Sequence, residues 1–134
     1  MSHHAAGTFE VKLVPLPLAD PASDTGLGRM SIDKTFSGDL QGTSTGEMLM
    51  AQTPVKGSAG YVAVERVNAS LQGRTGSFVL QHTGTMNRGV PSLSVSIVPD
   101  SGTGELVGIS GSLSIDIVEG KHLYALDYVL PVTE

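Results

Sequence analysis

Apolar and polar residues alternate along most of this 134-residue chain, and each alternating run ends at a cluster of turn residues. A period of two is typical of a β-strand with one face in the core, and no segment sustains a helical period. The runs lie at residues 8–18, 28–37, 43–53, 61–71, 75–86, 92–98, 112–118 and 122–130. Short connections rich in Gly, Pro, Asn and Asp join them, which is the pattern of an antiparallel meander.

Eight strands in a small domain can close on themselves, and closure removes the exposed strand edges. We therefore predict an all-β fold, a single antiparallel eight-stranded up-and-down β-barrel that occupies residues 1–134 as one domain. Residues 1–7, with His3 and His4, are expected to form a flexible N-terminal tail. One helical turn is expected near "SGTGELVG".

Composition excludes several classes of partner. The net charge is −5 and the chain has only eight Lys and Arg residues, which argues against a nucleic-acid partner. Cysteine is absent, so disulfides and thiolate chemistry are excluded. The N-terminus lacks the pattern of a signal peptide, and no apolar run approaches the ~20 residues that cross a bilayer. We expect a cytoplasmic protein with no membrane partner.

The stretch "GRTGSFVLQHTGTM" places Phe78, Leu80 and His82 on one face of a strand. If Gly73 and Arg74 form a two-residue hairpin loop, His82 lies directly opposite Glu65. The other face of this hairpin is polar, and a one-residue slip would turn that polar face inward. We therefore predict that Glu65 and His82 face each other inside the barrel, and that Gly73 lies in the turn with a positive φ.

A second hairpin, with a loop at Gly120 and Lys121, pairs Ile117 with Tyr124. It turns Tyr124, Leu126 and Tyr128 inward and places His122 near the rim. On residues 28–37 the inner set includes Lys34, whose long side chain is expected to reach a rim of the barrel.

The predicted Glu65–His82 pair has two interpretations. A carboxylate and an imidazole in contact can move a proton or orient a ligand, and perturbed ionisable groups are enriched at functional sites. The pair can also be a satisfied polar contact in the core or at the barrel mouth. His82, His122 and Glu65 are the residue types of a two-histidine, one-carboxylate metal site, but the sequence shows no metal-ligand spacing. We predict no metal and no cofactor.

Three runs carry a resemblance to a known family: "GYVAVERVNASLQGRTGSFVLQHTGTM", "VPDSGTGELVGISGSLSI" and "GKHLYALDYVL". They resemble a family of small bacterial proteins catalogued only as a domain of unknown function, over most of the chain from about residue 28 to residue 130. That family is similar in fold to allene oxide cyclase, a plant barrel that closes a fatty-acid epoxide inside an apolar cavity. The resemblance implies a calycin-like barrel and an apolar ligand. It does not imply cyclase activity, and no catalytic residue is carried over.

Three functions follow from these observations. The first is a barrel that binds an apolar or amphipathic small molecule. The second is a cofactor-free isomerase, cyclase or lyase in which Glu65 or His82 moves a proton. The third is a structural or interaction barrel with a filled core, and in each case the chain could form a homo-oligomer. The predicted catalytic residues are Glu65 and His82, and the predicted ligand-binding residues are Tyr61, Phe78, Leu80, His122, Tyr124, Leu126 and Tyr128.

Overall fold

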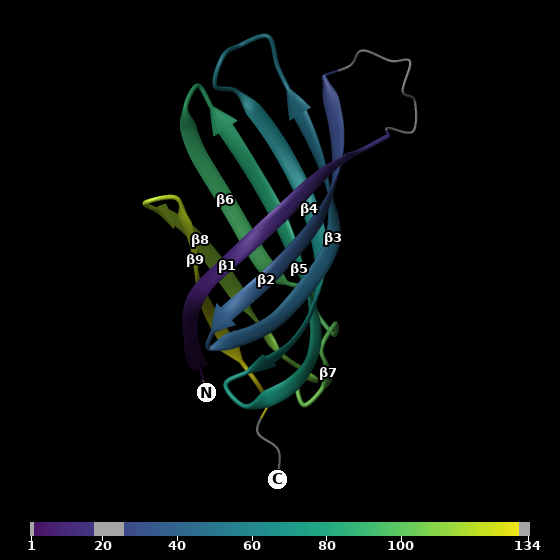
Figure 1. Ribbon diagram of the computed structural model, residues 1–134, viewed down its shortest axis with the longest axis vertical. Helices are drawn as coiled ribbons and strands as arrows, with labels where there is room; N and C mark the ends of the chain where they lie inside the picture. Colours follow the sequence, from purple (N-terminus) through teal and green to yellow (C-terminus); the bar gives the residue numbers. More distant parts are fainter. Residues whose placement is uncertain (1, 18–25, 132–134) are drawn as a thin grey trace.

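The chain forms one antiparallel sheet that closes into a barrel (Figure 1). The computed structural model describes residues 2–17 and 26–131. The strands are β1 (Ser2–Leu16), β2 (Leu27–Gly38), β3 (Leu40–Gln52), β4 (Ala59–Leu71), β5 (Arg74–Asn87), β6 (Val90–Ile97), β7 (Thr103–Gly104), β8 (Ser110–Val118) and β9 (Lys121–Val129). Eight of them form the wall, and the two-residue β7 is an extra strand beside β5.

Neighbours in the sequence are neighbours in the wall, as an up-and-down barrel requires. The β4–β5 and β1–β9 pairings complete the circle, and all the pairings are antiparallel. The predicted all-β eight-stranded barrel is therefore confirmed. The described ranges contain no helix, and the segment expected to form a helical turn forms β7 and hydrogen-bonded turns instead.

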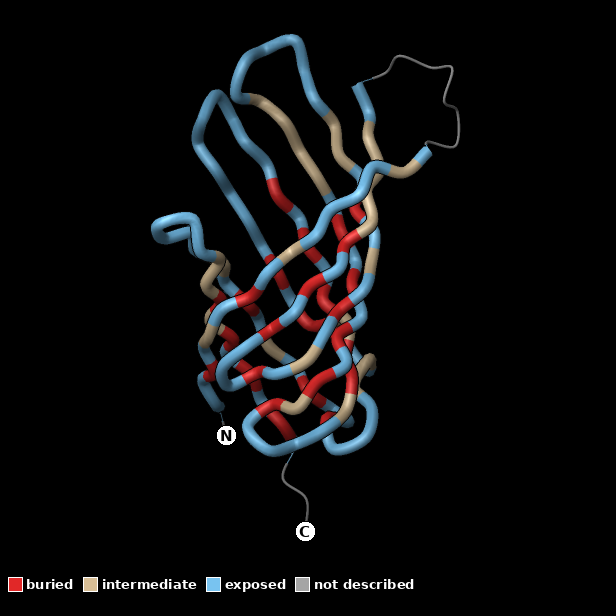
Figure 2. Tube along the Cα trace, viewed as in Figure 1, coloured by how far each residue is buried: buried red, intermediate tan, exposed pale blue. Residues whose placement is uncertain are grey.

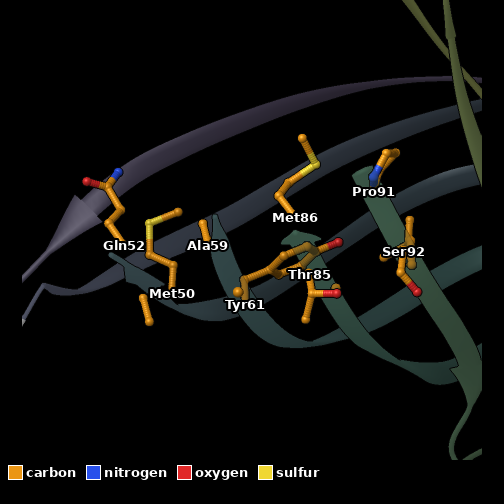
Figure 3. Close-up of a pocket in the computed structure, with 12 residues that line it drawn as sticks. Met50, Gln52, Ala59, Tyr61, Thr85, Met86, Pro91 and Ser92 are labelled. Carbon is orange, nitrogen blue, oxygen red and sulfur yellow. The ribbon is translucent and has the colours of Figure 1, made fainter. Parts of the chain in front are cut away.

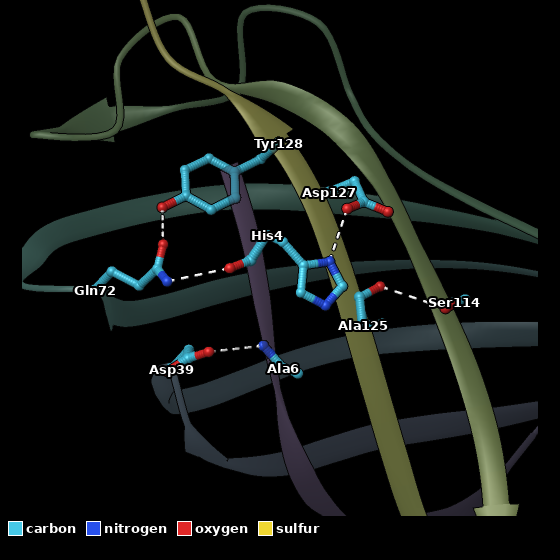
Figure 4. Close-up of polar contacts among 8 residues, drawn as sticks. All are labelled: His4, Ala6, Asp39, Gln72, Ser114, Ala125, Asp127 and Tyr128. Atoms are coloured by element: carbon cyan, nitrogen blue, oxygen red, sulfur yellow. Dashed lines mark hydrogen bonds and ion pairs between the residues drawn. The ribbon is translucent and has the colours of Figure 1, made fainter. Parts of the chain in front are cut away.

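Residues 2–7 are part of β1, so the prediction of a flexible tail is wrong for them, while residue 1 lies outside the described residues. Ser2 to Phe9 pair in register with β9, from Val129 back to His122. Figure 4 shows how side chains fasten this segment: His4 Nδ1 lies 2.8 Å from an Asp127 carboxylate oxygen, and a carboxylate oxygen of Asp39 accepts from the Ala6 N–H. The partner strand lies at the other end of the sequence, so the local pattern could not reveal it.

Three hairpins turn through two-residue loops, and the glycine is the second residue of each. The loops are Gln72–Gly73, Arg88–Gly89 and Glu119–Gly120, and all six residues have a positive φ. Gly73 has the expected positive φ of 88°, but the predicted loops Gly73–Arg74 and Gly120–Lys121 are wrong by one residue. Two positive φ values define a type I′ turn, which favours glycine in the second position.

Moving each loop by one residue changes the strand pairing by two residues, so each side chain stays on its predicted face of the sheet. Glu65 pairs with Leu80 and His82 pairs with Ala63, rather than Glu65 with His82. In the other hairpin Ile117 pairs with His122 instead of Tyr124. Because a shift of two residues preserves the side-chain alternation, Glu65 and His82 both still point inward.

Side chains fill one end of the barrel, which we call the closed end. It is bounded by the turns at Asp39 and Gln72–Gly73 and by the connection from Val98 to Ile109, and Figures 1 and 2 show it beside both termini. Leu106 and Ile109 of that connection are buried and plug the barrel. A Cβ at Gly76 would overlap the Thr103 carbonyl oxygen, so this small residue admits the plug rather than leaving a hollow.

The opposite end, which we call the open end, has an incomplete wall. The β1–β9 pairing stops at Phe9 and His122, and β6 pairs with β8 only through Val95 and Ser96. In the described part of the chain, residues 11–16 of β1 and 90–94 of β6 therefore have a strand neighbour on one side only. Figure 2 shows that most buried positions lie toward the closed end, while the hairpins of the open end are exposed.

Candidate functional site

Three inward side chains from neighbouring strands meet at Glu65, which is 0% exposed. One carboxylate oxygen, Oε2, accepts from Lys34 Nζ at 2.8 Å and contacts His82 Nε2 at 2.5 Å. The other, Oε1, accepts from the Ser44 hydroxyl at 2.7 Å. Lys34, Ser44, Glu65 and His82 come from β2, β3, β4 and β5, and we call them the polar layer.

The barrel geometry explains how these side chains reach one another. Glu65 and His82 lie diagonally across the β4–β5 pair, a spacing that long side chains can bridge. Gly46 is the direct partner of Glu65 on β3, and a Cβ there would overlap Glu65. The absence of a side chain at Gly46 therefore lets β3 approach β4 closely beside Glu65.

Lys34 does not reach a rim, so that prediction is wrong. Its side chain is 8% exposed, and its ammonium group lies 4.8 Å from the centre of the Phe9 ring as well as on Glu65. The alternation placed Lys34 on the inner face, but its depth depends on the stagger of the strands. Lys34 and Ser44 are the members of the polar layer that the sequence did not single out as site residues.

Glu65 is a carboxylate at neutral pH. Burial raises the pKa of Glu65, but the hydrogen bond with His82, the charge and hydrogen bond of Lys34 and the Ser44 hydroxyl together lower it to about 2. If Glu65 and His82 were buried together without other charged groups, burial would also allow a protonated Glu65. The His82 hydrogen bond, followed by the charge of Lys34, favours the ionised form.

The ionised Glu65 sets the protonation of His82. A carboxylate only accepts, so the Nε2 atom that contacts it must carry a proton. Nδ1 of His82 makes no hydrogen bond within the described ranges. No side-chain nitrogen or oxygen atom of those ranges is both fully enclosed and without a partner, so Nδ1 keeps some accessible surface. The side chain of His82 is only 4% exposed.

A cavity of about 290 Å³ lies on the inner surface of the open end (Figure 3). Its lining residues come from β3 to β6 and are Met50, Ala51, Gln52, Ala59, Gly60, Tyr61, Gly84, Thr85, Met86, Pro91, Ser92 and Leu93. The ring of Tyr61 lies against Gly84, where a Cβ would overlap it. Burial, with the charge of Glu65 as a smaller cause, raises the pKa of Tyr61.

Residues 5–128 match a family model described as a protein of unknown function, DUF3224. The chain belongs to the DUF3224 family. It is also similar to a DUF3224 protein of unknown function from Shewanella oneidensis MR-1, with 47% sequence identity and a TM-score of 0.93 over 99% of this chain and 100% of that chain. No curated protein matches the sequence.

In this DUF3224 chain, Tyr61 is the predicted ligand-binding residue that lines the cavity. Phe78, Leu80 and Leu126 are each 0% exposed in the packed core, so they are not on its surface. Gly84 occupies the inner position above His82 on β5, and neither Glu65 nor His82 lines the cavity. The ring of Tyr61, which lines the cavity, lies against Gly84.

The remaining aromatic residues hold the fold together. The Tyr124 hydroxyl accepts from the Leu40 N–H at 2.9 Å and donates to the Ser37 carbonyl oxygen at 2.9 Å. It therefore satisfies two backbone hydrogen-bonding groups of the β2–β3 turn. Tyr128 donates to the side-chain oxygen of Gln72. His122 stacks at a tilt against Phe9, with ring centres 5.1 Å apart.

The described residues contain no group of three or more His, Cys, Asp or Glu side chains that could hold a metal ion. Within the same residues, no helix has the length and apolar character needed to cross a membrane. His82, His122 and Glu65 therefore do not form a three-ligand cluster here, since His122 is the member outside the polar layer.

Proposed function

We propose that this protein binds a compact apolar or amphipathic small molecule in the cavity at the open end of the barrel. The observation that carries the proposal is the contrast between the two ends. The closed end is packed by Leu106, Ile109 and the surrounding core, whereas the open end keeps a cavity of about 290 Å³. Small-molecule sites are typically concave and mostly apolar with a few polar groups, so this pocket is a candidate ligand site.

The size of the cavity limits the ligand. Water occupies about 30 Å³ per molecule in the liquid, so this cavity corresponds to about ten water molecules. A ligand with about ten non-hydrogen atoms fits that space. The side chains of Met50, Met86 and Leu93 supply apolar contacts, and Tyr61 adds an aromatic ring with a hydroxyl.

The strand edges beside the cavity support a ligand rather than an added strand. Each free edge carries a proline, Pro15 on β1 and Pro91 on β6. Proline has no N–H to donate to a neighbouring strand and is typical of protected sheet edges. The gap in the wall therefore suits the entry of a small molecule better than pairing with another chain.

Binding is tested with naphthalene, a hydrocarbon of suitable size, by calorimetry and by the thermal stability of the protein. We expect saturable binding and a higher melting temperature, because a ligand that binds only the folded state stabilises it. Ala59→Trp fills the cavity and should abolish both effects, whereas Val62→Trp, on the exposed outer face of β4, should preserve them. Equal binding by the two variants would contradict this location.

A second candidate function is a cofactor-free isomerase, cyclase or lyase. The contact between the ionised Glu65 and His82 favours it, because a carboxylate that orients an imidazole is a common arrangement for a general base. Small molecules that copurify with the protein should be identified by mass spectrometry and then incubated with wild type and His82→Gln. Turnover that requires His82 would support an enzyme, and unchanged ligand would leave binding as the function. Homo-oligomerisation and a cytoplasmic location stay predictions.

A further inference from the structure

We propose that the hydroxyl group of Tyr61 donates a hydrogen bond to an acceptor oxygen of the ligand, such as that of a ketone. The cavity would then select compact apolar molecules with such an oxygen over plain hydrocarbons. This inference rests on the proposed binding function and names the chemistry of its ligand. In it Tyr61 decides specificity, and the apolar side chains around it supply contact area.

The ring of Tyr61 extends from β4 across β5 toward β6. Tyr61 pairs with Gly84 of β5, and Gly84 pairs in turn with Leu93 of β6. A Cβ on Gly84 would overlap Cε1 of the Tyr61 ring and lie 3.1 Å from Cζ, the atom that carries the hydroxyl group. The outer part of the ring therefore lies over Gly84, and Figure 3 shows the hydroxyl end directed toward the strand of Pro91 and Ser92.

The Tyr61 hydroxyl is an available donor on the cavity surface. It makes no hydrogen bond to the residues that the structure describes, and Tyr61 lines the cavity. No side-chain oxygen of these residues is both fully enclosed and without a partner, so this hydroxyl keeps accessible surface. Burial, with the charge of Glu65 as a smaller cause, raises the pKa of Tyr61, so the group keeps its proton at neutral pH and can donate it.

The hydroxyl makes the cavity sensitive to what the ligand carries at this point. A hydrocarbon would displace water from the Tyr61 hydroxyl without replacing its hydrogen bond, which is unfavourable. A ligand with a carbonyl oxygen there would restore that bond. The rest of such a ligand would still contact Met50, Met86 and Leu93.

The described lining residues include few other polar side chains. Thr85 and Ser92 pair with each other on β5 and β6, and their positions alternate with the inward pair of Gly84 and Leu93. They therefore belong to the outer face of the sheet. Gln52 is the remaining polar side chain of the lining, and Figure 3 shows it across the cavity from the phenol group. Its amide is the competing donor, so it is removed separately.

The experiment compares tetralin with 1-tetralone, two probes that differ by one carbonyl group, by calorimetry. We expect Tyr61→Phe to weaken the binding of 1-tetralone about fivefold, as the loss of one hydrogen bond would give, and to leave the affinity for tetralin unchanged. Gln52→Leu should keep the wild-type ratio of the two affinities. Tyr128→Phe, which removes a hydroxyl group at the closed end, is the matched control and should also keep it.

The ratio of the two affinities separates this inference from the proposed function. An equal ratio in wild type and Tyr61→Phe, or a ratio that changes in Gln52→Leu instead, would overturn the inference while binding itself remained. If neither probe binds to wild type, the proposed function fails and the inference fails with it.

The infrared carbonyl stretch of bound 1-tetralone provides a test in the wild-type protein. A hydrogen bond to the carbonyl oxygen lowers this frequency relative to its value in hexane. We expect the lowered frequency in wild type and a return toward the hexane value in Tyr61→Phe. A wild-type frequency equal to that in hexane, or the same lowered frequency in both proteins, would contradict a bond from Tyr61.

Discussion

Glu65 should make the stability of this protein depend on pH below neutrality. Its pKa is lowered from 4.5 to about 2 in the folded state. The folded state therefore binds its proton less readily than the unfolded state, and the resulting stabilisation is present above the unfolded pKa. It should be lost as the pH falls from about 5 toward the folded pKa near 2.

The magnitude follows from the same shift. A difference of about 2.5 pKa units corresponds to about 3 kcal/mol of unfolding free energy, since each unit is about 1.4 kcal/mol. Glu65→Gln removes the titrating group and leaves the buried ammonium of Lys34 without its carboxylate. At pH 7 the variant should be less stable than wild type by about 3–5 kcal/mol, the usual cost of breaking a buried pair.

The assay is urea denaturation of both proteins at a series of pH values from 7 to 2.5. We expect the stability difference between wild type and Glu65→Gln to shrink by about 3 kcal/mol over the acidic part of that series. Glu10→Gln, at an exposed position of β1, is the matched control and should follow the wild-type curve closely. A constant difference between wild type and Glu65→Gln at every pH would refute the reasoning.

Two further predictions concern the fold. Gly73→Val should lower stability by about 1–2 kcal/mol, because Gly73 has a φ of 88° and an added Cβ there meets no other atom, so the cost is backbone strain alone. Gly73→Asn should be milder, and equal melting temperatures for Gly73→Val and wild type would exclude the positive φ. Tyr124→Phe should cost about 1–3 kcal/mol in urea denaturation, since it leaves the buried Leu40 N–H without its acceptor. Tyr128→Phe should cost less, because its partner Gln72 is exposed to water, and the reverse order would contradict this role for Tyr124.

The alternation of residues predicted the barrel and the inward faces correctly because both depend on local pattern. Glu65 and His82 were placed inside by the polar residues on the opposite face of their hairpin, and that argument does not require the register to be right. The predicted strand pairing was offset by two residues, because the prediction made Gly73 the first residue of the two-residue loop. Type I′ turns place glycine second, and Gln72 adopts the positive φ that precedes it.

Features that depend on distant strands could not be predicted in this way. Lys34 lies deep in the barrel because the stagger of β1, β2 and β3 places it level with Glu65, and no local pattern encodes that stagger. Ser2–Gly7 form a strand because β9, at the far end of the chain, pairs with them. The open end has a gap in its wall because the β8–β9 hairpin is shorter than the hairpins around it, so its pairing with β1 and β6 stops early. The lengths of hairpins on opposite sides of the barrel decide this, and no local pattern reveals it.

The place of the polar layer in the barrel argues for a role beyond stability. On β2 and β4 it separates two apolar clusters: Phe36 and Val67 lie on its closed-end side, and Ile32 and Ala63 lie on its open-end side. Apolar side chains of similar volume would join the two clusters, and such replacements of buried ion pairs are often as stable or more stable. The chain instead keeps a lysine, a glutamate and a histidine at this level, held by hydrogen bonds. What this arrangement provides, and an apolar layer could not, is an imidazole and an ammonium group held in place by a buried carboxylate.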